Sequence, residues 1–91
     1  MKIKVRQMTS DRSGNPVANQ FIIETARGRY FQSYKSIIAF RNKNTGKVIL
    51  DKIYWDYSVT TMKYLKKFLG GNAADTRAKI KSGMYSLANL N

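Results

Sequence analysis

The side chains that could do chemistry in this sequence are cations, and half of the excess positive charge lies in less than a third of the chain. Residues 25–50 contain six Lys and Arg and no Asp or Glu, with aromatic residues between them. The cations are Arg27, Arg29, Lys35, Arg41, Lys43 and Lys47, and the aromatic residues are Tyr30, Phe31, Tyr34 and Phe40. Arginine and lysine neutralise phosphates while bases stack on aromatic rings, so this pattern is typical of single-stranded nucleic-acid binding.

The same pattern has a purely structural explanation. Alternate aromatic residues of a strand can fill the core, and the cations between them can simply face water. For any single aromatic residue we favour the core, with Tyr30 and Tyr34 kept as possible stacking platforms. For the basic stretch as a whole we favour binding, because a solvated face usually carries charges of both signs.

A second group of cations falls on one side of a predicted helix. Lys63, Lys66 and Lys67 would lie opposite its apolar residues, where they could follow phosphates or enter a major groove. The alternative, a helix side that faces only solvent, is favoured because base readout typically uses Arg, Asn or Gln. These lysines are therefore a reserve site.

Catalytic chemistry is not supported by the composition. The chain has no His and no Cys, which removes imidazole bases, thiol nucleophiles and thiolate zinc sites. Its five carboxylates include no pair at a spacing that suggests acid–base work or magnesium binding, and phosphate-loop and dinucleotide motifs are absent from the sequence. We therefore expect a non-enzymatic protein with no catalytic residues, no metal site and no cofactor.

Length and charge set the class of protein and of partner. The 91 residues fit one small domain, residues 1–91, and a formal charge of +12 points to a polyanionic partner. No apolar run is long enough for a signal peptide or a membrane span, so we expect a cytoplasmic protein with no membrane partner. Exposed sheet edges could pair two copies, but two such cations repel each other, so monomer and homodimer both stay open.

Sequence periodicity predicts strands in the first part of the chain. Alternation predicts a strand over residues 2–8 with Ile3 and Val5 on its buried face, and residues 10–16 read as a loop. Further strands are predicted at residues 21–25, 30–34, 37–41 and 47–50, where 37–41 either continues the third strand or forms a fourth. Asn42 to Gly46 lies between two strands at hairpin distance, with Gly46 suited to a positive φ.

The last third changes to helical periodicity. Ser58 is a good N-cap for a helix over residues 59–69, and Gly70 would end it. Asn72 can cap a shorter helix over residues 73–81. The apolar residues of the remaining tail, 84–91, predict that it docks on the body of the domain.

These elements predict an α+β domain: an antiparallel sheet of four to five strands packed against one main helix, with a short second C-terminal helix. The predicted core draws on residues from every element. It comprises Ile3, Val5, Phe21, Ile23, Ile38, Val48, Leu50, Trp55, Met62, Leu65 and Leu69.

Two sequence blocks have a familiar pattern. Residues 30–39 read YFQSYKSIIA, and residues 55–64 read WDYSVTTMKY and continue into Phe68, Leu69 and Gly70. Together they resemble a group of small, functionally unassigned proteins encoded by bacteriophages and mobile elements of bacteria. The likeness spans residues 19–91, including IKSGMY at 80–85 and the final Leu90 and Asn91. It implies origin and a single-domain architecture, and no mechanism.

The function that fits these observations is non-enzymatic binding of nucleic acid, DNA or RNA, mainly through phosphate contacts from the basic, aromatic-interleaved sheet. The alternative is a phage-encoded modulator or inhibitor that binds an acidic surface of a host protein. The positive charge argues against DNA mimicry, because proteins that mimic DNA are acidic.

Overall fold

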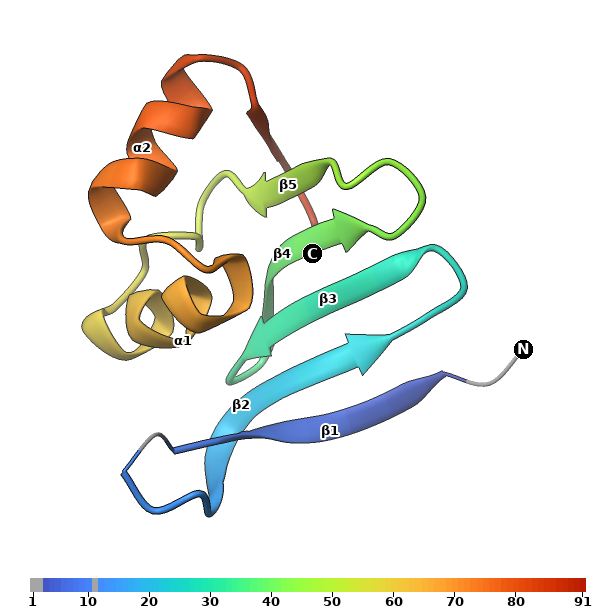
Figure 1. Ribbon diagram of the computed structural model, residues 1–91, viewed down its shortest axis with the longest axis vertical. Helices are drawn as coiled ribbons and strands as arrows, with labels where there is room; N and C mark the ends of the chain where they lie inside the picture. The colour runs from blue at the N-terminus through green and yellow to red at the C-terminus, as the bar shows by residue number, and fades with distance from the viewer. Residues whose placement is uncertain (1–2, 11) are drawn as a thin grey trace.

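Six strands form one sheet in which the strands lie side by side in chain order (Figure 1). The computed structural model describes residues 3–10 and 12–91. The strands are β1 (Lys4–Thr9), β2 (Pro16–Glu24), β3 (Gly28–Ser33), β4 (Ser36–Asn42), β5 (Val48–Asp51) and β6 (Tyr85–Ala88). Two helices, α1 (Val59–Leu69) and α2 (Ala73–Lys81), lie in the chain between β5 and β6. The predicted α+β class is confirmed.

The sheet differs from the prediction in its last strand. It has six strands, not four to five, and β6 pairs parallel to β5 although all other pairs are antiparallel. Parallel neighbours need a long crossover connection, which α1 and α2 supply here. Four residues with mixed polarity give too weak an alternation to identify β6 from sequence. The prediction that the tail docks on the body is confirmed by this pairing.

Both helices begin and end where the sequence predicts. The Ser58 hydroxyl accepts a hydrogen bond from the Thr61 N–H at 3.1 Å, and Gly70 ends α1 in the left-handed conformation. The Asn72 side chain accepts from the Asp75 N–H at 2.8 Å, and the Asp75 carboxylate accepts from the Asn72 N–H at 3.4 Å. This reciprocal arrangement is a capping box, which satisfies two backbone donors at the start of α2.

The inner face of the sheet, against which the helices pack, holds the core. Ile22, Phe31, Ala39 and Leu50 are neighbours in register across β2–β5, and all four are buried. The Phe31 ring stacks on that of Phe68 in α1, with ring centroids 5.9 Å apart. The opposite, outer face carries a second row in register: Val5, Ile23, Tyr30, Phe40 and Ile49.

Four of the predicted core residues lie outside the core. Ile3 and Val5 are 67% and 61% exposed, and Phe21 and Ile23 are only half-buried. Alternation identified which residues of a strand share a face, but not which face the helices cover. The buried residue of β1 is Met8, which is in phase with Lys4 and Arg6. Met62 is half-buried against the core, and the other six predicted core residues are buried: Ile38, Val48, Leu50, Trp55, Leu65 and Leu69.

A buried carboxylate fixes the end of the chain to the sheet. One oxygen of Asp51 accepts hydrogen bonds from the backbone N–H of Leu90 at 2.8 Å and from the side-chain amide of Asn91 at 3.0 Å. The other accepts from the N–H groups of Ile53 and Tyr54 at 3.1 and 2.9 Å. Burial alone would raise the pKa of Asp51, but these four hydrogen bonds outweigh it and hold the pKa below its usual value.

Candidate nucleic-acid interface

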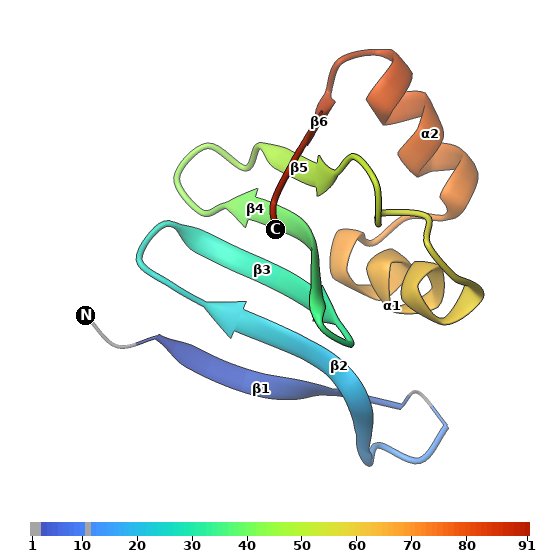
Figure 2. The same ribbon diagram turned by 180° about the vertical axis from the view of Figure 1, so that it is seen from behind.

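The helices cover only part of the inner face. α1 contacts β3 and β4: the hydroxyls of Thr61 and Ser33 lie 2.9 Å apart, and Arg41 Nη2 donates to the Leu69 carbonyl at 3.3 Å. In the two opposite views of the ribbon, β1 and β2 lie at the end of the sheet away from α2 (Figures 1 and 2). The inner face of the first part of β1, at Lys4 and Arg6, and of the adjoining end of β2 therefore extends beyond the helices and is open to solvent.

Two adjoining hollows lie along this open surface. The larger, of about 450 Å³, is lined by Lys4, Glu24, Thr25, Gly28, Arg29, Arg41 and Lys43. The smaller, of about 270 Å³, is lined by Arg6, Gln7, Met8, Thr9, Ile22, Arg29, Arg41, Lys67 and Phe68. Because they share Arg29 and Arg41, we treat them as one feature, the basic trough. Its lining residues include six cations from β1, β3, β4, α1 and the β4–β5 turn, and one carboxylate, Glu24.

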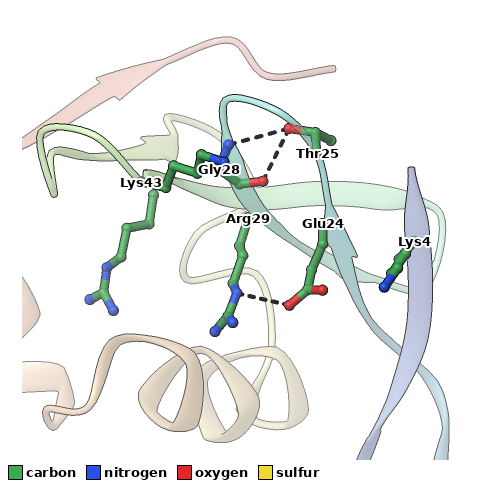
Figure 3. A pocket seen from close by; sticks show the side chains of 7 residues that line it. Lys4, Glu24, Thr25, Gly28, Arg29 and Lys43 are labelled. Carbon is green, nitrogen blue, oxygen red and sulfur yellow. Dashed lines mark hydrogen bonds and ion pairs between the residues drawn. The ribbon is translucent and has the colours of Figure 1, made fainter. Parts of the chain in front are cut away.

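Glu24, the one carboxylate among the described residues that line the trough, joins two arginines from different strands. Glu24 Oε1 lies 3.0 Å from Arg29 Nε and 3.6 Å from Arg6 Nη2. Figure 3 shows Lys4, Glu24 and Arg29 projecting from three neighbouring strands to the same side of the sheet, with the Glu24–Arg29 ion pair dashed. Both arginine side chains remain 60% exposed, so the pairing orients them without removing them from solvent.

Arg41 sits at the border between the trough and the core. Its guanidinium donates to the Leu69 carbonyl at the C-terminal end of α1 and lies 5.9 Å from the centroid of the Phe68 ring. A cation at this position satisfies a free carbonyl and interacts favourably with the helix dipole. Arg41 therefore helps to hold α1 on the sheet as well as lining the trough.

Four of the predicted binding cations line the trough: Arg29, Arg41, Lys43 and Lys67. The Lys67 ammonium also donates to the carbonyl of Thr9, which ties α1 to the end of β1. The other predicted cations lie elsewhere. Arg27, Lys35 and Lys47 are exposed in or beside hairpin turns, and Lys63 and Lys66 are exposed on α1. The structure thus brings together part of each basic group that the sequence singled out.

The two predicted stacking tyrosines are not in the trough. Tyr30 lies on the outer face, half-buried, with its ring centroid 4.6 Å from that of Phe40. Tyr34 is exposed in the β3–β4 turn, where its φ is +57° and its N–H donates to the Asn19 carbonyl at 2.6 Å. Phe68 contributes an aromatic ring to the trough lining, and the Arg41 guanidinium lies 5.9 Å from the centroid of this ring.

Two trough residues, Lys4 and Arg6, were not among the predicted site residues. Assigning Ile3 and Val5 to the core placed the cations of β1 on the outer, solvent side. The signal that could have identified them is that β1 begins the chain of hairpins, so it forms a sheet edge that helices near the C-terminus need not reach.

The sequence matches the model of a family of unknown function, DUF8033, over residues 3–83. The chain belongs to this family. No curated protein and no solved structure matches the chain. Family membership therefore agrees with the resemblance to functionally unassigned proteins and supplies no activity.

The chemistry that the trough offers is anion binding. Guanidinium and ammonium groups donate hydrogen bonds and carry no acceptor, so a ligand must bring acceptor oxygens and negative charge. The described residues contain no group of three or more acidic side chains that could hold a metal ion. Neither described helix is long and apolar enough to cross a membrane.

Proposed function

We propose that this protein is a non-enzymatic nucleic-acid-binding protein that holds the phosphate backbone in its basic trough. The observation that carries the proposal is the convergence of six cations from both ends of the sequence on one open surface with one carboxylate. A side of the domain that only needed to be soluble would mix charges of both signs. Such an excess of cationic donors over anionic acceptors fits a ligand with many phosphate oxygens.

Phosphate contacts, and not base stacking, dominate this proposal. The rings of Tyr30 and Phe40 pack on each other on the outer face, away from the trough cations. Base recognition by aromatic platforms requires rings that lie beside the cations that hold the backbone. The trough has the cations, but the aromatic ring in its lining, that of Phe68, is half-buried and stacks on Phe31. We therefore expect binding that depends weakly on base sequence.

Salt dependence of binding tests the proposal. Each phosphate neutralised by a cation releases counterions, so the logarithm of the affinity should fall linearly with the logarithm of salt concentration. Four or five contacts would give a slope of about −3.6 to −4.5 on duplex DNA. The measurement is fluorescence anisotropy with duplex DNA, single-stranded DNA and RNA at several salt concentrations. Absence of binding to all three at low salt would refute the proposed function.

Paired substitutions place the binding surface. The variant Lys4→Gln/Arg29→Gln removes two trough cations, and we expect it to weaken binding by about tenfold or more at low salt and to flatten the salt slope by about 2. Lys35→Gln/Lys66→Gln is the matched control, since it removes the same charge at exposed positions outside the trough. Equal losses in the two variants would show that net charge, and not the trough, determines binding. Arg41 is unsuitable here because it also contacts α1.

A protein partner is the second candidate, and a separate observation favours it. Ile53, Tyr57 and Val59 are 63%, 64% and 88% exposed within one segment that leads into α1. We propose as the alternative that this segment anchors a modulator or inhibitor on a host protein, with the cations facing an acidic surface. Apolar anchors make such binding less sensitive to salt than phosphate binding is. If Tyr57→Ser/Val59→Ser loses nucleic-acid affinity, the segment takes part in nucleic-acid binding. Its exposed apolar side chains would then no longer support a protein partner.

The resemblance of residues 30–39 and 55–64 leads us to propose, in addition, that the chain originates from a bacteriophage or a bacterial mobile element and acts in the cytoplasm of the bacterial cell. The genes beside those of other family members test this. Neighbours drawn from ordinary chromosomal operons, without phage or mobile-element genes, would contradict the proposal.

A further inference from the structure

The basic trough contains one place where arginines from three strands converge. Arg6, Arg29 and Arg41 come from β1, β3 and β4 and all line the smaller hollow together with Lys67. Among the described residues that line this hollow, none is acidic. Arginine presents several donors in a planar fork that matches the oxygens of a phosphate, so three arginines at one hollow can bind one group from several directions.

A carboxylate already shows what this place binds. Glu24 ends β2, the strand between β1 and β3, and its Oε1 is within ion-pair distance of Arg6 on β1 and Arg29 on β3. A carboxylate oxygen and a phosphate oxygen are both charged acceptors that take the same guanidinium donors. Glu24, which lines the adjoining larger hollow, therefore occupies guanidinium donors that a ligand oxygen would take.

We propose that Arg6, Arg29 and Arg41 form a discrete phosphate-binding site and that Glu24 is its built-in competitor. The ligand class is a phosphate group, and within the proposed function it is a backbone phosphate of the bound nucleic acid. This inference rests on the proposed function for its biological ligand, although the site itself is defined by chemistry that inorganic phosphate shares.

The competition has a definite direction. Glu24 pairs with arginines whose side chains are 60% exposed, and exposed ion pairs are weak because water screens them. A phosphate carries charge on several oxygens and can engage both guanidiniums at once, so it displaces the carboxylate or forces it aside. The carboxylate must then sit near a second anion, which repels it. Glu24 lowers the affinity of the site and limits how tightly the trough holds nucleic acid.

Replacing the carboxylate tests the competition. We expect Glu24→Gln to bind duplex DNA about three- to tenfold more tightly than the natural chain at low salt and to steepen the salt slope by about 1. Asp56→Asn is the matched control, because it makes the same change in net charge at an exposed position just before α1. Glu24→Gln binding no tighter than Asp56→Asn would overturn the proposal. Weaker binding would do so too, because Glu24 would then serve to position the arginines.

A second measurement separates this proposal from the proposed function. Inorganic phosphate is titrated into the full chain while the side-chain Nε–H signals of its arginines are followed by NMR. We expect saturable shifts for Arg6, Arg29 and Arg41 and none for Arg77, which lies over the Trp55 ring on the α2 side of the domain. Shifts without nucleic-acid binding would leave the site standing and refute the function. Nucleic-acid binding without these shifts would refute the phosphate site and leave the proposed function standing.

Discussion

Two parts of the inner sheet face differ in the residues they carry: one part is apolar and buried, and the other is charged and exposed. Where the helices cover the inner face, the cross-strand neighbours on β3, β4 and β5 are Phe31, Ala39 and Leu50, all fully buried. Where the face extends beyond the helices, on β1 and the end of β2, the residues at corresponding inward positions are Lys4, Arg6 and Glu24. The cross-strand rows that hold these residues run in register from β1 to at least β4. The presence of a covering helix, and not strand geometry, therefore separates core from candidate binding surface.

The border between the two parts is made by residues that belong to both. Arg29 and Arg41 are direct cross-strand partners, and like charges at such positions destabilise a sheet. The structure offsets this in different ways on the two sides. In the open part, Arg29 forms an ion pair with the carboxylate of Glu24. In the covered part, Arg41 donates a hydrogen bond to the carbonyl of Leu69.

The largest contrast expected between the two parts is in stability. Phe31→Ala removes a fully buried ring and should lower the free energy of unfolding by about 4 kcal/mol. Val5→Ala, on the outer face of the edge strand, should change it by less than about 0.5 kcal/mol. Urea denaturation measures both, and Phe31→Leu serves if the alanine variant does not fold. Similar losses at the two positions would mean that β1 is part of the cooperative core.

The next effect concerns the border itself, at the start of β3. A Cβ on Gly28 would lie 2.0 Å from the backbone carbonyl oxygen of Arg41, so Gly28→Ala must separate β3 from β4 beside the trough. We expect a loss of about 3 kcal/mol. Gly46→Ala is the control, since Gly46 also has a positive φ but has open space around it, and it should cost about 1 kcal/mol. Thermal unfolding of the two variants distinguishes the steric clash at Gly28 from the backbone strain that both positions share. Equal decreases in the unfolding temperature would contradict the steric argument.

The smallest of these effects depends on pH and belongs to the covered part. The pKa of Asp51 is lower in the folded chain than in the unfolded one, so its contribution is complete above about pH 4 and is lost as pH falls through the folded pKa. Asp51→Asn should cost about 2 kcal/mol at pH 7 and much less near pH 2. Denaturation at both pH values measures this, with Asp56→Asn as an exposed control. A difference that does not shrink in acid would show that the charge is not what stabilises the tail.

Much of the local structure was predictable because its signals are local. Ser58, Gly70 and Asn72 fix the ends of the helices through hydrogen bonds and backbone conformations within a few residues. Gly46, with a φ of +73°, likewise fixes the β4–β5 turn. The hairpin order of the first five strands follows from their short connections.

The candidate site was only partly predictable because its location depends on what covers the sheet. Strand alternation assigns residues to two faces without saying which face meets a helix, so it predicts Val5 in the core and Lys4 in solvent, the reverse of what the structure shows for their faces. The parallel pairing of β6, which sets where the helices cross, joins residues far apart in sequence, such as Val48 and Tyr85. Lys67 and Arg29 meet at one hollow for the same long-range reason.

The parallel strand β6 explains why an open surface exists at all. Successive strands joined by hairpins are connected at their ends, so such connections leave both faces of a sheet bare. Among the described elements, the β5–β6 connection is the one that contains helices and passes over a face. Two helices of 11 and 9 residues span only part of a six-stranded sheet. The bare cationic strands are thus a consequence of connectivity: a chain with a second helical crossover would bury them, and one without any would have no core to support them.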